Sequence, residues 1–63
     1  MSKLRKLREE RLISKSELAR KAGISTVTLD RIEKGYKCRV ATKRRILEAL
    51  GLTVRDKDKV FDD

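Results

Sequence analysis

The chain has 63 residues, with 18 lysines and arginines against 10 aspartates and glutamates and a formal net charge of +8. This length allows one domain with one small core. With no histidine and a single cysteine, the chain cannot form an internal disulfide, a Cys/His zinc site or a histidine-based catalytic triad. We therefore expect a protein that is not an enzyme and needs no cofactor or metal.

The positive charge is concentrated in residues 1–55, which carry sixteen basic and six acidic side chains, whereas residues 56–63 carry two and four. Such a surplus attracts nucleic acid through counterion release, although an anionic membrane surface or simple solubility would also use it. No apolar run approaches the ~20 residues that span a bilayer. The N-terminal segment also lacks the apolar stretch of a secretory signal. We expect a cytoplasmic protein that does not enter a membrane.

The first expected helix covers residues 3–12 and places Leu4, Leu7 and Leu12 on its packing side. A second helix is expected over residues 15–22. Ser14 and Glu17 have the spacing of a capping box, which marks its start. Gly23 ends it, because a sharp exit from a helix commonly needs a left-handed backbone. The apolar face of this helix consists of Leu18, Ala19 and Ala22.

A third helix is expected from Ser25, its N-cap, to about Glu33. Ile24 returns to the core before it begins. Leu29 and Ile32 lie three residues apart and face inward together. Gly35 closes this helix, and a basic loop follows over residues 36–40.

A fourth helix is expected from Ala41 or Thr42 to Leu50, where Gly51 stops it; its core positions are Ile46, Leu47 and Leu50. The end of the chain adds smaller packing elements. Leu52 and Val54 are expected to seal the base of the core, Val60 and Phe61 to anchor one last helical turn, and Asp62 and Asp63 to fray. With no strand alternation, the fold class is all-α with four to five helices.

The second and third helices meet at Gly23 with almost no loop, which is the layout of a helix-turn-helix. Two helices that cross steeply after so short a turn approach closely at Ala19. In such motifs the second helix enters the major groove of DNA. We therefore divide the chain into a DNA-binding domain over residues 1–54 and a short acidic C-terminal helix or tail over residues 55–63.

The sequence resembles the Cro and lambda-repressor type of helix-turn-helix regulator, the XRE family. The structural motif positions that carry the resemblance are Arg8, Leu18, Ala19, Gly23, Ile24, Leu29, Ile32 and Glu33. The resemblance implies a compact lambda-repressor-like fold and a transcriptional regulator, most simply a repressor, that binds specific sequences of double-stranded DNA. It also implies a structural salt bridge between Arg8 and Glu33. Lys15 stands where the family usually has glutamine; it cannot accept a hydrogen bond, which leaves a bridge to the third helix without its usual acceptor.

The candidate base-reading residues are Thr26, Val27, Asp30 and Arg31. Arg31 matches guanine O6 and N7, and the methyl groups of Val27 and Thr26 match a thymine methyl. The alternatives are that Val27 is a further core residue and that Arg31 is a solvated or phosphate-bound charge. Asp30 either accepts from a cytosine amino group or pairs with Arg31 or Lys34, and the pairing with Lys34 is the favoured reading.

The candidate phosphate contacts flank this helix; they are Lys15, Thr28, Lys34, Lys37, Arg39 and Lys43. A solvated basic face is the alternative for each. Lys43, Arg44 and Arg45 occupy the first turn of a helix, where cations are unfavourable, and this placement favours an anionic partner. Tyr36 either donates a hydrogen bond from its hydroxyl to a phosphate, contacts a second copy in a dimer, or is a half-buried loop residue. Cys38 is expected to be a bystander thiol.

Useful specificity is expected to need a homodimer on DNA, with residues 54–61 as the expected contact surface. A second class of function stays open, in which the acidic tail binds a protein partner, as in an antitoxin or an adaptor. RNA binding is a third class. The scarcity of aromatic residues argues against it, because single-stranded bases stack on aromatic rings and the chain has only Tyr36 and Phe61.

Overall fold

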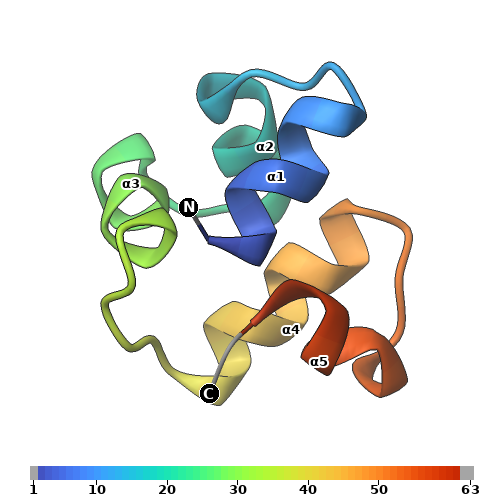
Figure 1. The fold of residues 1–63 in the computed structure, drawn as a ribbon. Helices are drawn as coiled ribbons and strands as arrows, with labels where there is room; N and C mark the ends of the chain where they lie inside the picture. Colours follow the sequence, from blue (N-terminus) through green and yellow to red (C-terminus); the bar gives the residue numbers. More distant parts are fainter. Residues whose placement is uncertain (1, 62–63) are drawn as a thin grey trace.

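Within residues 2–61, the part of the chain that the computed structural model describes, five α-helices and one 3-10 turn form the fold (Figure 1). In chain order they are α1 (Lys3–Glu10), α2 (Lys15–Ala22), α3 (Thr26–Glu33), α4 (Val40–Ala49), the 3-10 turn η1 (Val54–Asp56) and α5 (Lys57–Val60). No strand occurs in these residues, and the predicted all-α fold is confirmed. None of these helices is both long and apolar enough to cross a membrane.

Serine side chains start the first three helices, each by accepting a hydrogen bond from a backbone N–H of the first turn. The bonds, all 3.1 Å long, join Ser2 to Arg5, Ser14 to Glu17 and Ser25 to Thr28. Both predicted caps are confirmed, and Ser2 adds a third. Only one half of the predicted capping box forms, because the Glu17 carboxylate lies 3.4 Å from Nζ of Lys21 instead.

Gly23 ends α2 as predicted and turns the chain directly into α3. Its φ of 71° and ψ of 32° lie in the left-handed region that glycine adopts at little cost. The N–H of Ile24 donates to the carbonyl of Ala19 at 3.0 Å, and that of Gly23 to Arg20 at 3.2 Å, which together form a Schellman closure. Ala19 is buried in the contact between the helices, which explains the small residue there.

The core lies between α2 and α4, with α3 packed against α2, α5 against α4, and α1 against α3 and α5. Its fully buried large side chains are Leu4, Leu18, Leu29, Ile46, Leu47 and Val60. Phe61 is buried beside them, and α5 packs against α1 and α4. Nζ of Lys3 also donates to the carbonyl of Asp58 at 3.0 Å. Residues at the C-terminal end therefore close the same core as the rest of the chain.

The structure differs from the sequence-based expectation at several boundaries. Helix α1 ends at Glu10 rather than residue 12, and Leu12 is 92 % exposed instead of packed. Val54 was expected to seal the core but is 58 % exposed at the start of η1. Leu52, which had the same expected role, does pack against the core. Helix α4 begins at Val40, earlier than expected. Asp62 and Asp63 lie outside the described residues.

Leu12 leaves the packing side because the chain must turn between α1 and the cap of α2. The N–H of Ile13 donates to the carbonyl of Arg8 at 3.2 Å, and Leu12 takes a left-handed φ of 56° within that turn. Among the described residues other than glycine, Leu12 alone has a positive φ. A branched residue in this conformation is strained.

Replacing Leu12 by asparagine is expected to stabilise the fold by about 0.5–1 kcal/mol, since asparagine tolerates the left-handed region and the exposed leucine contributes little burial. Urea denaturation followed by circular dichroism measures the change. Leu12→Ala supplies the control, because it removes the same exposed side chain without relieving the backbone. Equal midpoints for the two variants would show that the backbone strain is not the cause.

Candidate nucleic-acid interface

Helix α3 has one face in the core and the opposite face in solvent. Leu29 and Ile32 are buried, whereas Val27 is 61 % exposed and Thr26 and Arg31 are exposed as well. The alternative that Val27 is a further core residue is therefore wrong. Helix α3 lies at the left edge of the molecule, above the loop that leads to α4 (Figure 1). The exposed residues of α3 are therefore accessible to a partner.

A groove runs between α3 and the loop that follows it. Its lining consists of Thr28, Arg31, Ile32, Tyr36, Lys37, Cys38, Arg39 and Thr42. Three cations, Arg31, Lys37 and Arg39, therefore border one depression next to the exposed face of α3. Tyr36 is exposed on its rim rather than half buried, while Cys38 is partly buried and packs against the core. Thr28 accepts a hydrogen bond from the hydroxyl of Ser25 at 2.9 Å.

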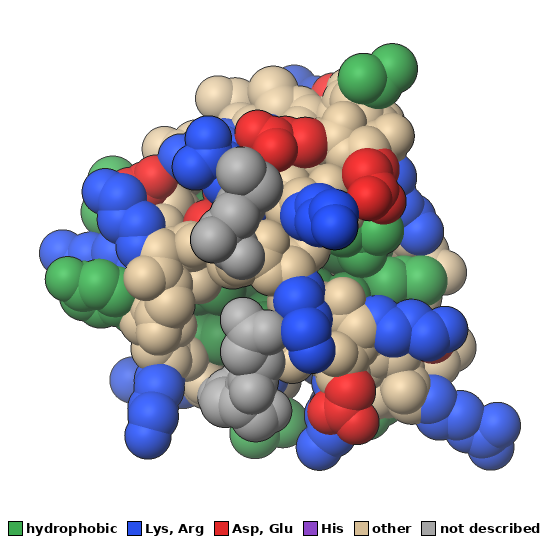
Figure 2. All heavy atoms as spheres, in the orientation of Figure 1, with side chains coloured by type: hydrophobic (Ala, Val, Ile, Leu, Met, Phe, Trp, Pro, Cys, Tyr) green, Lys and Arg blue, Asp and Glu red, His purple; other side chains and the backbone are tan. Residues whose placement is uncertain are grey.

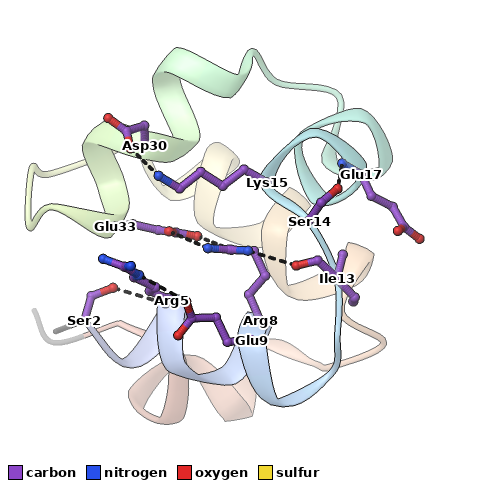
Figure 3. A network of polar contacts seen from close by, with 10 residues as sticks. All are labelled: Ser2, Arg5, Arg8, Glu9, Ile13, Ser14, Lys15, Glu17, Asp30 and Glu33. Carbon is purple, nitrogen blue, oxygen red and sulfur yellow. Dashed lines mark hydrogen bonds and ion pairs between the residues drawn. The ribbon is translucent and has the colours of Figure 1, made fainter.

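A buried ion pair fixes α3 against α1 (Figure 3). Nε of Arg8 donates to Oε2 of Glu33 at 2.7 Å, and a second guanidinium nitrogen donates to Oε1 at 3.2 Å. The same guanidinium also donates to the carbonyl of Ile13 at 2.9 Å. The hydrogen bond with Glu33 raises the pKa of Arg8 above its ordinary value. The salt bridge implied by the resemblance is confirmed, and it ties three segments together.

A second, partly exposed ion-pair cluster joins α2 to α3. Nζ of Lys15 lies 2.5 Å from Oδ1 of Asp30, and Nζ of Lys34 lies 2.9 Å from Oδ2. The predicted pairing of Asp30 with Lys34 is confirmed. Lysine cannot accept a hydrogen bond, but a bridge from Lys15 to α3 is present because Lys15 donates and Asp30 supplies the acceptor (Figure 3). Asp30 thus holds one lysine with each of its two oxygens.

The hydrogen bonds from Lys15 and then Lys34 lower the pKa of Asp30 from its ordinary 3.8 to about 2. The bonds to Thr53 and Lys59 lower that of Asp56 as well. A carboxyl whose pKa is lowered by folding stabilises the fold above its ordinary pKa and loses that contribution as the pH falls through the folded value.

We therefore expect the melting temperature of the wild type to fall between about pH 4 and pH 2, and to fall less steeply in Asp30→Asn. Melting curves recorded by circular dichroism across this range measure the difference. Parallel loss of stability in the two proteins would contradict the assignment. The Asp30→Asn variant should still lose some stability in acid, because the pKa of Asp56 is also lowered by folding and Asp56 is unchanged.

The start of α4 differs from the first three helices because its N-cap, Arg39, makes no side-chain capping hydrogen bond. No acidic residue lies in its first turn. The positive end of this helix dipole therefore coincides with basic side chains. Lys43 lies over the ring of Phe61, with Nζ 5.6 Å from the ring centroid, so its ammonium group is close to the C-terminal end of the core.

On the face shown in Figure 2, basic side chains lie along several edges, including the left edge where α3 and the loop after it lie, and acidic side chains are fewer and set among them. Of the six candidate phosphate contacts, Thr28, Lys34, Lys37 and Arg39 are exposed and Lys15 and Lys43 partly exposed. The structure brings Thr28, Lys37 and Arg39 into the groove beside Arg31. Lys15 and Lys34 do not line that groove, and both pair with Asp30.

Sequence reasoning missed Thr42, which lines the groove from the first turn of α4. Its position directly after the basic loop, at the start of a helix, could have indicated that Thr42 lies beside the basic residues. It also missed a second depression between the end of α2 and α4, bordered by Arg20, Lys21 and Arg45. That second depression depends on the angle between two helices, which the residue pattern does not contain.

The family model described as helix-turn-helix matches residues 4–57 of the chain. The chain belongs to this helix-turn-helix family, of the Cro and lambda-repressor type. No curated protein and no solved structure gives a significant match. In this helix-turn-helix protein, α2, the turn at Gly23 and α3 form the motif. The family is one of DNA-binding transcription regulators, and duplex DNA is the partner it suggests.

Proposed function

We propose that this helix-turn-helix protein regulates transcription, most simply as a repressor, by reading a specific duplex sequence with α3 in the major groove. The observation that carries the proposal is the exposed stripe of Thr26, Val27 and Arg31 on a helix whose other face is buried. A recognition helix needs both an anchored side and a free side, and its N-terminal residues reach the base edges.

Each exposed side chain of α3 suits a particular contact. The planar guanidinium of Arg31 can donate two hydrogen bonds to guanine O6 and N7, and the methyl groups of Val27 and Thr26 fit against a thymine methyl. Lys37, Arg39 and Thr28 border the groove next to Arg31, where a phosphate backbone would pass. Regulation of this kind needs no catalytic step, because occupancy of the site excludes polymerase.

We propose a dimer contact that keeps only the first part of the surface expected from sequence, residues 54–61. Val60 and Phe61 are 1 % and 6 % exposed, so they are not available to a second copy. Val40 and Val54 are 72 % and 58 % exposed and border one shallow apolar depression with Leu47. A single module covers only ~600–1,000 Å² of DNA-facing surface, and pairing two copies through this depression would double it.

Burial of Val60 and Phe61 also weighs against the alternative of a protein partner bound by the tail. These two residues are the largest apolar side chains of the C-terminal end, and both pack in the core. A partner would meet mainly charged side chains there. Among the exposed apolar side chains, Val27 and Tyr36 lie on α3 and the loop after it and Val40 at the start of α4, whereas Leu12 and Val54 lie elsewhere.

Selection of bound duplexes from a random library tests the proposal. We expect a palindromic consensus with half-sites about one helical turn apart, which would establish both the site and the dimer. Binding to the selected duplex should weaken steeply with salt, by about 0.9 in log–log slope for each phosphate contact. Recovery of no consensus, together with an affinity that does not depend on salt, would overturn the proposal.

A further inference from the structure

We propose that Asp30 is an electrostatic latch that holds Lys15 and Lys34 away from the phosphate backbone and so lowers the affinity of the protein for non-cognate DNA. This inference rests on the proposed function and deepens it. It concerns discrimination between sequences rather than binding itself. The residue is a positioning residue for the two lysines.

The latch spans the two helices of the motif. Lys15 is the first residue of α2, Lys34 caps the C-terminal end of α3, and Asp30 lies one turn before Lys34. Both oxygens of Asp30 are used, at 2.5 Å to Lys15 and 2.9 Å to Lys34. Two lysines that would each suit a phosphate are therefore already paired with an anion on the same surface.

A phosphate that approaches either lysine must compete with this carboxylate. The three side chains together carry one net positive charge instead of two, and the carboxylate itself repels phosphate. The side chain of Lys15 is 39 % exposed, that of Lys34 is 67 % exposed and that of Asp30 is 33 % exposed. Exposed pairs of this kind are weak, so the latch can open without disturbing the core.

Opening depends on what the DNA presents to Asp30. A cytosine or adenine amino group donates a hydrogen bond to a carboxylate, and it can take the place of one lysine. The lysine released in this way becomes available to a phosphate. A base edge with only acceptor groups offers Asp30 no such donor, and both lysines stay paired. The base that faces Asp30 therefore determines whether Lys15 or Lys34 can contact the phosphate backbone of the DNA.

Asp30→Asn tests the latch, because asparagine keeps the shape of the side chain and removes its charge. The probe is a short duplex of scrambled sequence, titrated at several salt concentrations by fluorescence anisotropy. Release of two lysines is expected to steepen the slope of log affinity against log salt by up to about 1.8, or at most about 60-fold in affinity at about 0.1 M salt. Glu10→Gln is the matched control, since it makes the same charge change at an exposed position at the end of α1.

A second pair of variants separates release of a lysine from simple loss of a negative charge. Lys15→Gln is expected to change the slope little in the wild-type background, where Asp30 already holds Lys15. In the Asp30→Asn background the same change is expected to lower the slope by about 0.9. Circular dichroism confirms that each variant is folded before its slope is compared.

The outcomes separate the two proposals. Equal slopes for Asp30→Asn and Glu10→Gln, or an equal effect of Lys15→Gln in both backgrounds, would overturn the latch while DNA binding stands. A wild type whose binding does not change with salt would instead overturn the proposed function. A steeper slope in Asp30→Asn, lost again on adding Lys15→Gln, supports the latch.

Discussion

Glu33→Ala is expected to unfold most of the protein at room temperature. The side chains of Glu33 and Arg8 are only 2 % and 9 % exposed, so removal of the carboxylate leaves a guanidinium buried without its counter-charge. Breaking a buried pair in this way typically costs 3–5 kcal/mol, or about the whole stability that a core of this size supplies. Urea denaturation and thermal melting by circular dichroism measure the loss.

The double variant Arg8→Met with Glu33→Met distinguishes the cost of a buried unpaired charge from the value of the pair. Replacing both partners by apolar side chains of similar volume is often neutral or stabilising, so the double variant is expected to recover much of the stability. It also removes the donor to the carbonyl of Ile13, which sets a limit on the recovery. A single variant within about 0.5 kcal/mol of wild type would show that the pair does not hold α1 against α3.

Loss of this pair matters for function because it sets the position of α3. Glu33 is the last residue of α3, and Arg8 binds it from α1 while also donating to the carbonyl of Ile13, at the end of the turn before α2. The pair therefore fixes the orientation of α3 relative to α1. The buried pair holds α3 against α1, and the weaker, partly exposed pair between Lys15 and Asp30 joins α3 to α2.

The local features of the fold were predictable because they depend on neighbouring residues. Serine at a helix start and glycine at a helix end act through hydrogen bonds and backbone angles within a few residues, as at Ser25 and Gly23. Leu12 was predicted wrongly because its spacing continues the apolar pattern of α1. The turn into α2 takes precedence over that pattern and rotates Leu12 outward.

The same distinction between local and long-range features holds for the candidate site. Helical spacing alone separates the exposed Val27 and Arg31 from the buried Leu29. The bridge from Lys15 to Asp30 was not predictable, because it joins residues fifteen positions apart and depends on the angle between two helices. The contact of Lys43 with Phe61 was missed for the same reason, since it requires the fold of the C-terminal end.

Arg31→Ala is expected to weaken binding to the selected duplex by about 1–3 kcal/mol and to relax the base preference at one position of each half-site. The physical reason is that two donors of the guanidinium recognise one guanine, and alanine leaves all four base pairs nearly equivalent there. Arg31 is exposed on the solvent face of α3, so the variant should stay folded. Affinities for the selected duplex and for its single-base variants at one position measure both effects.

Lys37→Ala is the matched control, because Lys37 borders the same groove as Arg31 but lies on the loop after α3. If Lys37 contacts a phosphate, its loss weakens every duplex alike and lowers the salt slope by about 1, with the base preference unchanged. The two substitutions are therefore expected to affect different properties: Arg31→Ala the base preference, and Lys37→Ala the affinity for all duplexes. If Arg31→Ala also weakened all sequences equally, Arg31 would be a backbone contact, and the reading of bases would have to rest on Thr26, Val27 and Asp30.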